Sequence, residues 1–172
     1  MSTHVALLRG VNVGGRSKVS MQELRQLFED LGYSGVVTYI QSGNVVFDAA
    51  RSPASPAAIE KRIADAFGFD VAVVLRTPKE LAAIVERCPY PDPAKVHVMF
   101  FNRAPAKAAF AKLGPTAFGA DEFAVGRKEL YLHLPNGVGQ SKLPAALARQ
   151  ASPEATLRNW RTVTKLLELS QR

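Results

Sequence analysis

The sequence contains a single cysteine, Cys88, so no disulfide can form within the chain. Its apolar runs fall well short of the roughly 18 residues that a membrane-spanning helix needs. A secretory signal is also missing, because the N-terminal MSTHVALLRG has no cationic segment, apolar core or small-residue cleavage site. These absences predict a cytoplasmic protein, with no role for a membrane.

The motifs of several enzyme classes are missing as well. His4, His97 and His133 are not spaced as metal ligands, and the chain has no Gly-x-Ser-x-Gly elbow and no His-Glu-x-x-His pair. Cys88 falls on the apolar stripe of an expected helix, where cysteine behaves as a small apolar side chain. We therefore predict no catalytic residue, no metal site and no cofactor.

Charge is distributed unevenly between the two halves. Residues 1–86 hold nine basic and nine acidic side chains, whereas residues 87–172 hold thirteen basic and six acidic ones. The entire net charge of +7 therefore comes from the second half. Clustered cations attract anions, which favours an anionic partner for this half, and the plainer alternative is that the charge only aids solubility.

The hydrophobic pattern of the first half predicts a β-α-β-β-α-β order, which is typical of a ferredoxin-like fold. Ser20 and Glu23 form a capping box at the start of the first helix, and Gly32 is placed to end it. The expected elements are a strand at 5–8, a helix from 21, strands flanking 42–44, a helix between Ser55 and Gly68, and a strand at 71–75.

The second half suggests a related plan. A helix after Thr77 is closed by the proline-rich CPYPDPAK. A strand, a helix over 105–113, a hairpin around 126–128, and helices from about Ser141 and Thr156 follow, so a helix takes the place of the last strand. We predict an α+β protein with a ferredoxin-like subdomain at 1–76, a connecting helix and linker at 77–93, and a second α+β subdomain at 94–172 that ends in helices.

The segment LLRGVNVGGRSKVSM at 7–21 resembles a phosphate-binding loop, because Gly10, Gly15, Arg16 and Ser17 match its spacing with one changed residue type. In such a loop the helix starts directly at the glycines, so that its N-terminus faces the phosphates. Here the helix signal starts only at Ser20, and a guanidinium replaces the lysine. We therefore do not predict nucleotide hydrolysis.

The same loop is nevertheless a candidate binding site. In a ferredoxin-like sheet the first β-α loop and the hairpin between the second and third strands emerge at the same end. Outward-facing glycine amides beside basic side chains can form an anion-binding concavity. The alternative is that the glycines only turn the chain and the polar side chains are solvated. The predicted ligand-binding residues are Arg9, Asn12, Gly14, Gly15, Arg16, Lys18, Ser42 and Asn44, joined by Arg158 and Asn159 of the last helix.

The blocks LLRGVNVGG, KVSM and TYIQSGNVVF, together with SKL and ATLRNWRTVTKL near the C-terminus, resemble the uncharacterised bacterial family called domain of unknown function 1697. The resemblance implies a two-part α+β structure with ferredoxin-like character, and it brings no activity, substrate or cofactor. Gln140 stands where members often carry arginine. The signature positions of the family fall in this sequence on Arg9, Gly10, Asn12, Gly14, Gly15, Ser42, Gly43, Asn44, Lys142, Arg158, Asn159 and Trp160.

Three functional hypotheses follow. The first is a binding protein that captures a phosphorylated or other small anionic ligand at the first loop and the hairpin. The second is nonspecific nucleic-acid binding, without base stacking, through basic side chains of the second half. The third is an enzyme on a small anionic substrate, for which the sequence offers no catalytic base. The basic residues of the second hypothesis are Arg103, Lys107, Lys112, Arg127, Lys128 and Lys142.

Overall fold

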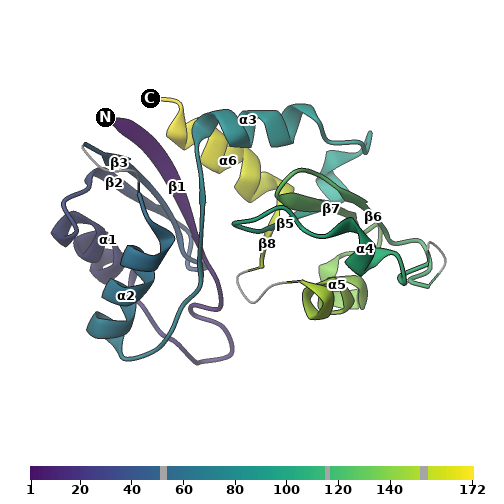
Figure 1. Ribbon diagram of the computed structural model, residues 1–172, viewed down its shortest axis with the longest axis horizontal. Coiled ribbons are helices and arrows are strands. Elements are labelled where there is room, and N and C mark those ends of the chain that lie inside the picture. Colours follow the sequence, from purple (N-terminus) through teal and green to yellow (C-terminus); the bar gives the residue numbers. More distant parts are fainter. Residues whose placement is uncertain (51–53, 115–116, 152–154) are drawn as a thin grey trace. The chain divides into compact units, whose positions relative to one another are not determined.

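A computed structural model describes residues 1–50, 54–114, 117–151 and 155–172. The fold is α+β and contains two four-stranded antiparallel sheets (Figure 1). The chain divides into two compact units. The first unit comprises Met1–Ala82 and Lys165–Arg172, and the second comprises Ala83–Thr164. No helix in the described residues is long and apolar enough to cross a membrane.

The first unit has the expected ferredoxin-like order. Its strands are arranged as β2-β3-β1-β4, so β3 lies between β1 and β2 and runs antiparallel to both. The ends of β1 and β2 therefore point the same way, as the sequence predicted. The elements are β1 (Ser2–Leu8), α1 (Met21–Asp30), β2 (Ser34–Tyr39), β3 (Asn44–Ala49), α2 (Pro56–Phe67) and β4 (Val73–Arg76).

The helix ends follow the capping signals of the sequence. At the start of α1 the Glu23 amide donates to Ser20 Oγ (3.0 Å), and the Glu23 carboxylate accepts from the Ser20 amide (3.4 Å). Gly32 follows the helix with a φ of +86°, a conformation in which a side chain would be strained. The helix α2 starts after Ser55 and ends at Gly68, whose φ is +77°. Both helix boundaries were thus predicted correctly.

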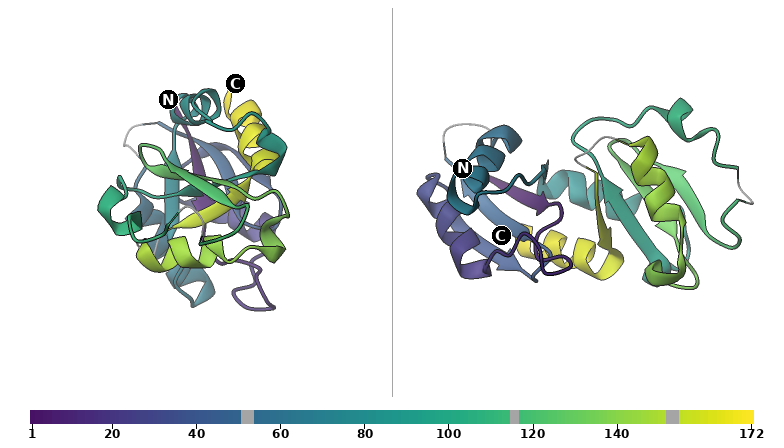
Figure 2. Two further views of the ribbon diagram at one scale, coloured as in Figure 1. Left: turned by 90° about the vertical axis from the view of Figure 1, so that its right-hand side faces the viewer. Right: turned by 90° about the horizontal axis from the view of Figure 1, so that it is seen from below.

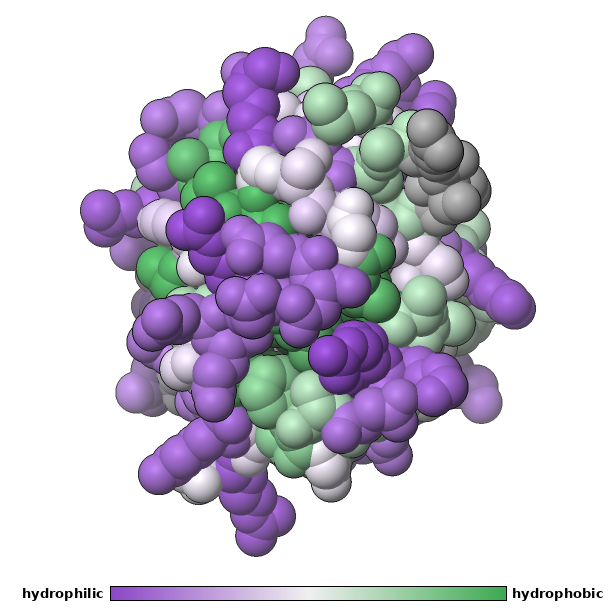
Figure 3. Space-filling view, turned by 90° about the vertical axis from the view of Figure 1, so that its left-hand side faces the viewer, coloured by the Kyte–Doolittle hydropathy of each residue, from purple (hydrophilic) through white to green (hydrophobic). Residues whose placement is uncertain are grey.

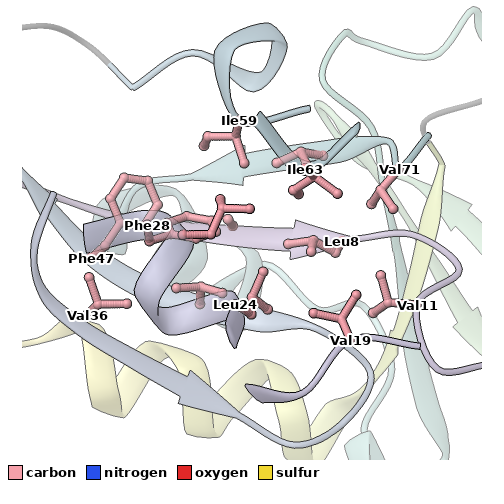
Figure 4. Packing of buried hydrophobic residues seen from close by; sticks show 14 residues of the cluster. Leu8, Val11, Val19, Leu24, Phe28, Val36, Phe47, Ile59, Ile63 and Val71 are labelled. Atoms are coloured by element: carbon pink, nitrogen blue, oxygen red, sulfur yellow. The ribbon is translucent and has the colours of Figure 1, made fainter. Parts of the chain in front are cut away.

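The core of the first unit packs α1 and α2 against one face of the sheet (Figure 4). Leu24 and Phe28 of α1 and Ile59 and Ile63 of α2 meet Phe47 and other strand residues there, all fully or nearly fully buried. The outer side of these helices carries mostly hydrophilic side chains, with apolar ones visible between them (Figure 3). This amphipathic pattern is what fixes the helices on the sheet.

The second unit repeats the ferredoxin-like topology, with the strand order β6-β7-β5-β8 (Figure 2). Leu143 and Leu147 of α5 pack with Met99, Leu130 and Leu132 of the sheet. The unit begins within α3 (Pro78–Glu86) and ends within α6 (Trp160–Ser170). Between them lie η1 (Pro93–Lys95), β5 (Val96–Phe100), α4 (Lys107–Phe110), β6 (Glu122–Val125), β7 (Glu129–His133), η2 (Val138–Gln140), α5 (Leu143–Gln150) and β8 (Thr156–Asn159).

Two expectations for this unit were wrong. The helix expected from Thr156 begins only at Trp160, because Thr156–Asn159 form β8 and pair with β5. The last strand is therefore present and is not replaced by a helix. Four strand residues next to a helix are too few to show a separate period, so the helical spacing of the following residues concealed them. The helix expected over 105–113 is also shorter, covering only Lys107–Phe110.

The helix α6 buries one of its faces. Trp160 is only half-buried, whereas Thr162, Val163, Leu166 and Ser170 are buried. Cys88, which was expected on the apolar stripe of the helix after Thr77, lies beyond the end of α3.

His97 of β5 has a buried Nδ1 atom without a hydrogen-bond partner among the described residues. Burial lowers the pKa of this histidine, so the folded protein binds the proton less readily than the unfolded chain does. Stability should then be complete above the unfolded pKa of about 6.5 and be lost as the pH falls below it. We predict that in His97→Leu the free energy of unfolding, measured with urea, falls less between pH 7 and pH 5 than it does in the wild type.

His4 remains in both proteins and also has a pKa lowered by burial, so the comparison isolates the contribution of His97. If the variant and the wild type lost the same unfolding free energy between pH 7 and pH 5, this role of His97 would be contradicted.

Candidate functional site

The loop between β1 and α1 forms a small hairpin beyond the end of β1 (Figure 1). The Arg16 amide donates to Val13 O (3.0 Å), and the Asn12 amide donates to Ser17 O (3.0 Å). Gly14 and Gly15 lie at its tip with φ values of +59° and +73°. Positive φ at both central residues is the signature of a type I′ turn, which glycine adopts without strain.

This geometry differs from that of a phosphate-binding loop. The glycines are followed by the returning strand of the small hairpin, and α1 begins only at Met21. The N-terminus of α1 is occupied by its own capping box, in which Ser20 and Glu23 take part. The amides of Gly14 and Gly15 therefore lie at an exposed turn and not at the start of a helix.

Asn12 joins this loop to the hairpin between β2 and β3. Its Nδ2 donates to Gln41 O (2.8 Å) and to Val19 O (3.0 Å), and its Oδ1 accepts from the Val19 amide (2.9 Å). Asn12 itself has a φ of +55°, which asparagine tolerates better than most residues. One side chain thus closes the base of the loop and attaches it to a segment 29 residues away.

The turn between β2 and β3 spans residues 40–43 and packs closely against the first loop. Gly43 has a φ of +85°, and a Cβ placed on it would lie 2.6 Å from Val11 Cγ2 and 3.0 Å from Leu8 Cβ. The Leu8 amide donates to Gly43 O (2.9 Å). Asn44 is fully buried at the start of β3, where its Nδ2 donates to Tyr39 O (2.9 Å) and Ser42 Oγ (3.0 Å).

These contacts define what we call the first rim, the surface formed by residues 9–18 and 40–44. The structure brings together here eight of the predicted residues. Val11 and Val19 anchor the loop by pointing into the core near Leu8 (Figure 4). The eight residues are Arg9, Asn12, Gly14, Gly15, Arg16, Lys18, Ser42 and Asn44.

The first rim is basic at its surface. Arg9, Arg16 and Lys18 are exposed, and residues 1–22 contain no aspartate or glutamate. The loop before β4 lies next to the rim, because Ala72 O accepts from the Arg9 amide (2.9 Å), and it carries the exposed carboxylate of Asp70. The local excess of cations therefore arises in the half of the sequence whose net charge is zero.

Sequence reasoning missed two apolar side chains of the rim. Val13 is 63% exposed and Ile40 is 47% exposed, each beside the polar residues of its turn. The glycines at positions 14 and 43 were a usable sequence signal, because the two turns that carry these side chains depend on them.

Arg158 and Asn159 belong to the second unit, and their predicted role at the first loop stays a prediction. Arg158 lies in β8 at 7% exposure, and its Nη1 donates to Thr156 Oγ1 (2.7 Å) and Leu157 O (2.9 Å). Burial lowers the pKa of its guanidinium to about 10. Asn159 Oδ1 accepts from the Thr162 amide (2.8 Å), so this side chain caps α6.

A buried arginine occurs at the equivalent strand of the first unit as well. Arg76 of β4 is 2% exposed, and its Nη1 donates to Leu75 O (2.8 Å), the carbonyl of the preceding residue. Arg76 and Arg158 thus lie in corresponding strands, are both buried, and each donate to the carbonyl of the preceding residue. This correspondence indicates that both arginines have a structural role. Among the described residues no group of three or more His, Cys, Asp or Glu side chains could hold a metal ion.

We predict that Asn12→Ala destabilises the protein by about 1–3 kcal/mol, because buried or half-buried groups lose their hydrogen-bond partners. Hydrogen exchange of the Val19 amide should accelerate, since its acceptor is removed. Gln41→Ala is the matched control, as it keeps the backbone carbonyl that Asn12 binds and removes only a side chain at 3.4 Å. Similar exchange rates at Val19 in wild type and Asn12→Ala would contradict this role.

We also predict that Gly43→Ala costs more stability than Gly68→Ala in urea unfolding. Both positions have positive φ, so both variants carry backbone strain of about 1 kcal/mol or more. Only Gly43 faces atoms within 4 Å, whereas nothing lies that close to a Cβ at Gly68. The difference between the two free energies measures the contact between the two segments of the rim. A larger loss of unfolding free energy in Gly68→Ala would contradict close packing of Gly43 against Leu8 and Val11.

Comparison with known proteins agrees with the two-unit α+β architecture. The conserved bacterial protein SP0830 from Streptococcus pneumoniae has a similar structure, with a TM-score of 0.78 over 100% of this chain and 99% of that chain. The two sequences are 22% identical, so this likeness concerns the fold alone. No curated protein matches the chain. The model of the family described as protein of unknown function (DUF1697) matches residues 1–131, and the chain belongs to that family.

Proposed function

We propose that the protein binds a small phosphorylated or otherwise anionic ligand at the first rim. The observation that carries this proposal is the concentration of exposed Arg9, Arg16 and Lys18 on a segment of 22 residues without a carboxylate. Such a surface raises the local concentration of anions and offers charge-assisted hydrogen bonds to their oxygens.

The construction of the rim supports the same proposal. A loop that must order itself on binding loses affinity to conformational entropy. Here the loop is closed by the Asn12 contacts and by the turn at Gly14 and Gly15, before any ligand arrives. In this proposal the two glycine amides and the Ser42 hydroxyl add neutral hydrogen bonds, while Asn12 and Asn44 hold the rim in shape.

The exposed apolar side chains refine the class of ligand. Val13 and Ile40 lie on the same two turns as the polar groups of the rim. An anion that carries an apolar or aromatic portion, such as a nucleotide, would use both kinds of surface. We place the binding function in the cytoplasm, in line with the single cysteine.

A second candidate function, nonspecific nucleic-acid binding, rests on the net charge of +7 in residues 87–172. Stacking of bases on either sheet is not favoured, because Phe47, Phe100 and Phe101 are at most 1% exposed. Contacts of this kind would involve the phosphate backbone and would weaken steeply with salt.

We predict that a thermal-shift panel of nucleotides, sugar phosphates and polyanions contains at least one small anion that stabilises the protein. A ligand at a hundredfold excess over its Kd should add about 2.7 kcal/mol. Arg16→Ala and Lys18→Ala should each weaken binding roughly tenfold, since each removes a charge-assisted contact. Both side chains are exposed, so neither change should alter the melting temperature without ligand by more than a small amount.

Lys107→Ala is the matched control, because it removes an exposed lysine from the second unit. Small-anion binding that is unaffected by Arg16→Ala and Lys18→Ala would refute the rim as the site. Retardation of a DNA or RNA duplex at low salt, reduced by Lys107→Ala and abolished by added salt, would instead support the second candidate.

A further inference from the structure

The second unit contains a pocket of about 440 Å³ at the edge of its core. Its walls come from the segment after α3, the segment before β6, and β6 itself. The volume lies within the range of small-molecule sites. The described residues that line it are Tyr90, Leu113, Gly114, Phe118, Asp121, Glu122 and Phe123, all from the second unit.

The chemistry of this lining is aromatic and acidic. It includes Tyr90, Phe118 and Phe123 together with the carboxylates of Asp121 and Glu122, and no lysine, arginine or histidine occurs among the described lining residues. Residues 87–172 hold thirteen basic and six acidic side chains, so two of only six carboxylates of this half meet in one pocket. The pocket is therefore suited to cations, although the second half of the sequence carries a net positive charge.

Two of the three aromatic side chains, Tyr90 and Phe123, contact other rings of the second unit. Tyr90 stacks on His133 with ring centroids 5.1 Å apart, and Phe123 meets the buried Phe110 edge to face at 6.2 Å. Both contacts restrict the rings that line the pocket. Aromatic faces carry negative electrostatic potential and attract cations, most strongly where several rings surround one site.

The two carboxylates have distinct settings. Asp121 Oδ2 accepts from Ser141 Oγ (2.6 Å), which in turn accepts from the Leu143 amide (3.1 Å), so Asp121 is fixed to the start of α5. Glu122 is exposed and is one of the residues that line the pocket. The pKa of Tyr90 is raised to about 12, mainly by burial and next by Glu122, so Tyr90 remains a neutral phenol at physiological pH.

We propose that this pocket binds a small organic cation of the quaternary or methylated ammonium class. The aromatic rings provide cation–π contacts, and Asp121 and Glu122 balance the positive charge of the ligand. An inorganic cation does not suit the site, because hard cations need six or more oxygen ligands and only two carboxylates line its described part. A small anion is disfavoured by the same two carboxylates. The inference is independent of the first rim, which lies in the other unit and attracts the opposite charge.

A second pocket of the same unit shows that this preference is local. It measures about 500 Å³ and has Arg87 and Arg127 among its lining residues. Its buried carboxylate, Glu129, accepts from the Lys128 amide (2.9 Å) and is thus already paired within its own turn. Arginine-lined and carboxylate-lined pockets therefore coexist in one unit and predict different ligands.

The test uses choline chloride and its neutral carbon isostere, 3,3-dimethylbutan-1-ol, each titrated into the full-length chain and followed by nuclear magnetic resonance at constant ionic strength. The two probes have nearly the same shape and differ in charge. We expect choline to bind roughly fivefold to thirtyfold more tightly than the isostere, which corresponds to a cation–π contribution of about 1–2 kcal/mol. Resonances of Tyr90, Phe118 and Phe123 should shift on binding.

Two variants locate the site. Glu122→Gln removes one charge at an exposed position, and Phe123→Leu removes one ring while keeping an apolar side chain. Each should weaken choline binding about threefold or more, whereas Glu86→Gln, which changes an exposed carboxylate outside the lining, should have no effect. Arg16→Ala should also leave choline binding unchanged, which separates this inference from the anion site.

Equal affinity for choline and its isostere would overturn the proposal and identify the pocket as merely apolar. Absence of choline binding up to the highest concentration tested would also overturn it. A loss of binding in Glu86→Gln as large as in Glu122→Gln would place the effect in the overall charge of the protein. The spectrum of each variant without ligand verifies that it is folded.

Discussion

The contact between Asn12 and the backbone of the neighbouring hairpin is the constraint on which the first rim depends. The side-chain Nδ2 of Asn12 donates to Val19 O of its own loop and to Gln41 O, 29 residues further along the chain. The exposed cations of the loop thereby share one rigid support with the turn at Gly43. The packing of Val11 against Gly43 supports the same arrangement, so a polar and an apolar contact together join the loop to the hairpin.

The two units show how one topology can support different surfaces. Each has the strand order of a ferredoxin-like sheet and a buried arginine in its fourth strand, Arg76 or Arg158. In the first unit the loop after the first strand is basic, and in the second unit the residues around β6 form an aromatic and acidic pocket. The shared elements provide stability, and the connections between them carry the chemical differences.

Local signals predicted most of the first unit. The capping box at Ser20 and the glycine after α1 specify helix ends through backbone chemistry that acts within a few residues. β8 was missed because its four residues are stabilised by pairing with β5, a contact that no local pattern reveals. For the site, topology placed the two segments at one end of the sheet. The Asn12 and Asn44 side chains bind backbone carbonyls of the protein itself, and only the structure could show this.

The division of the chain has a consequence for biosynthesis. The first unit is completed by Lys165–Arg172, and Arg172 reaches back to donate to Gly35 O and to pair with Asp48 (3.4 Å). A ribosome that has synthesised residues 1–82 has therefore not yet produced the segment that completes this unit. The contacts of Arg172 with Gly35 and Asp48 can therefore form only after residues 83–164 have been synthesised, whereas the helix and strand residues of the first core all precede them in the sequence.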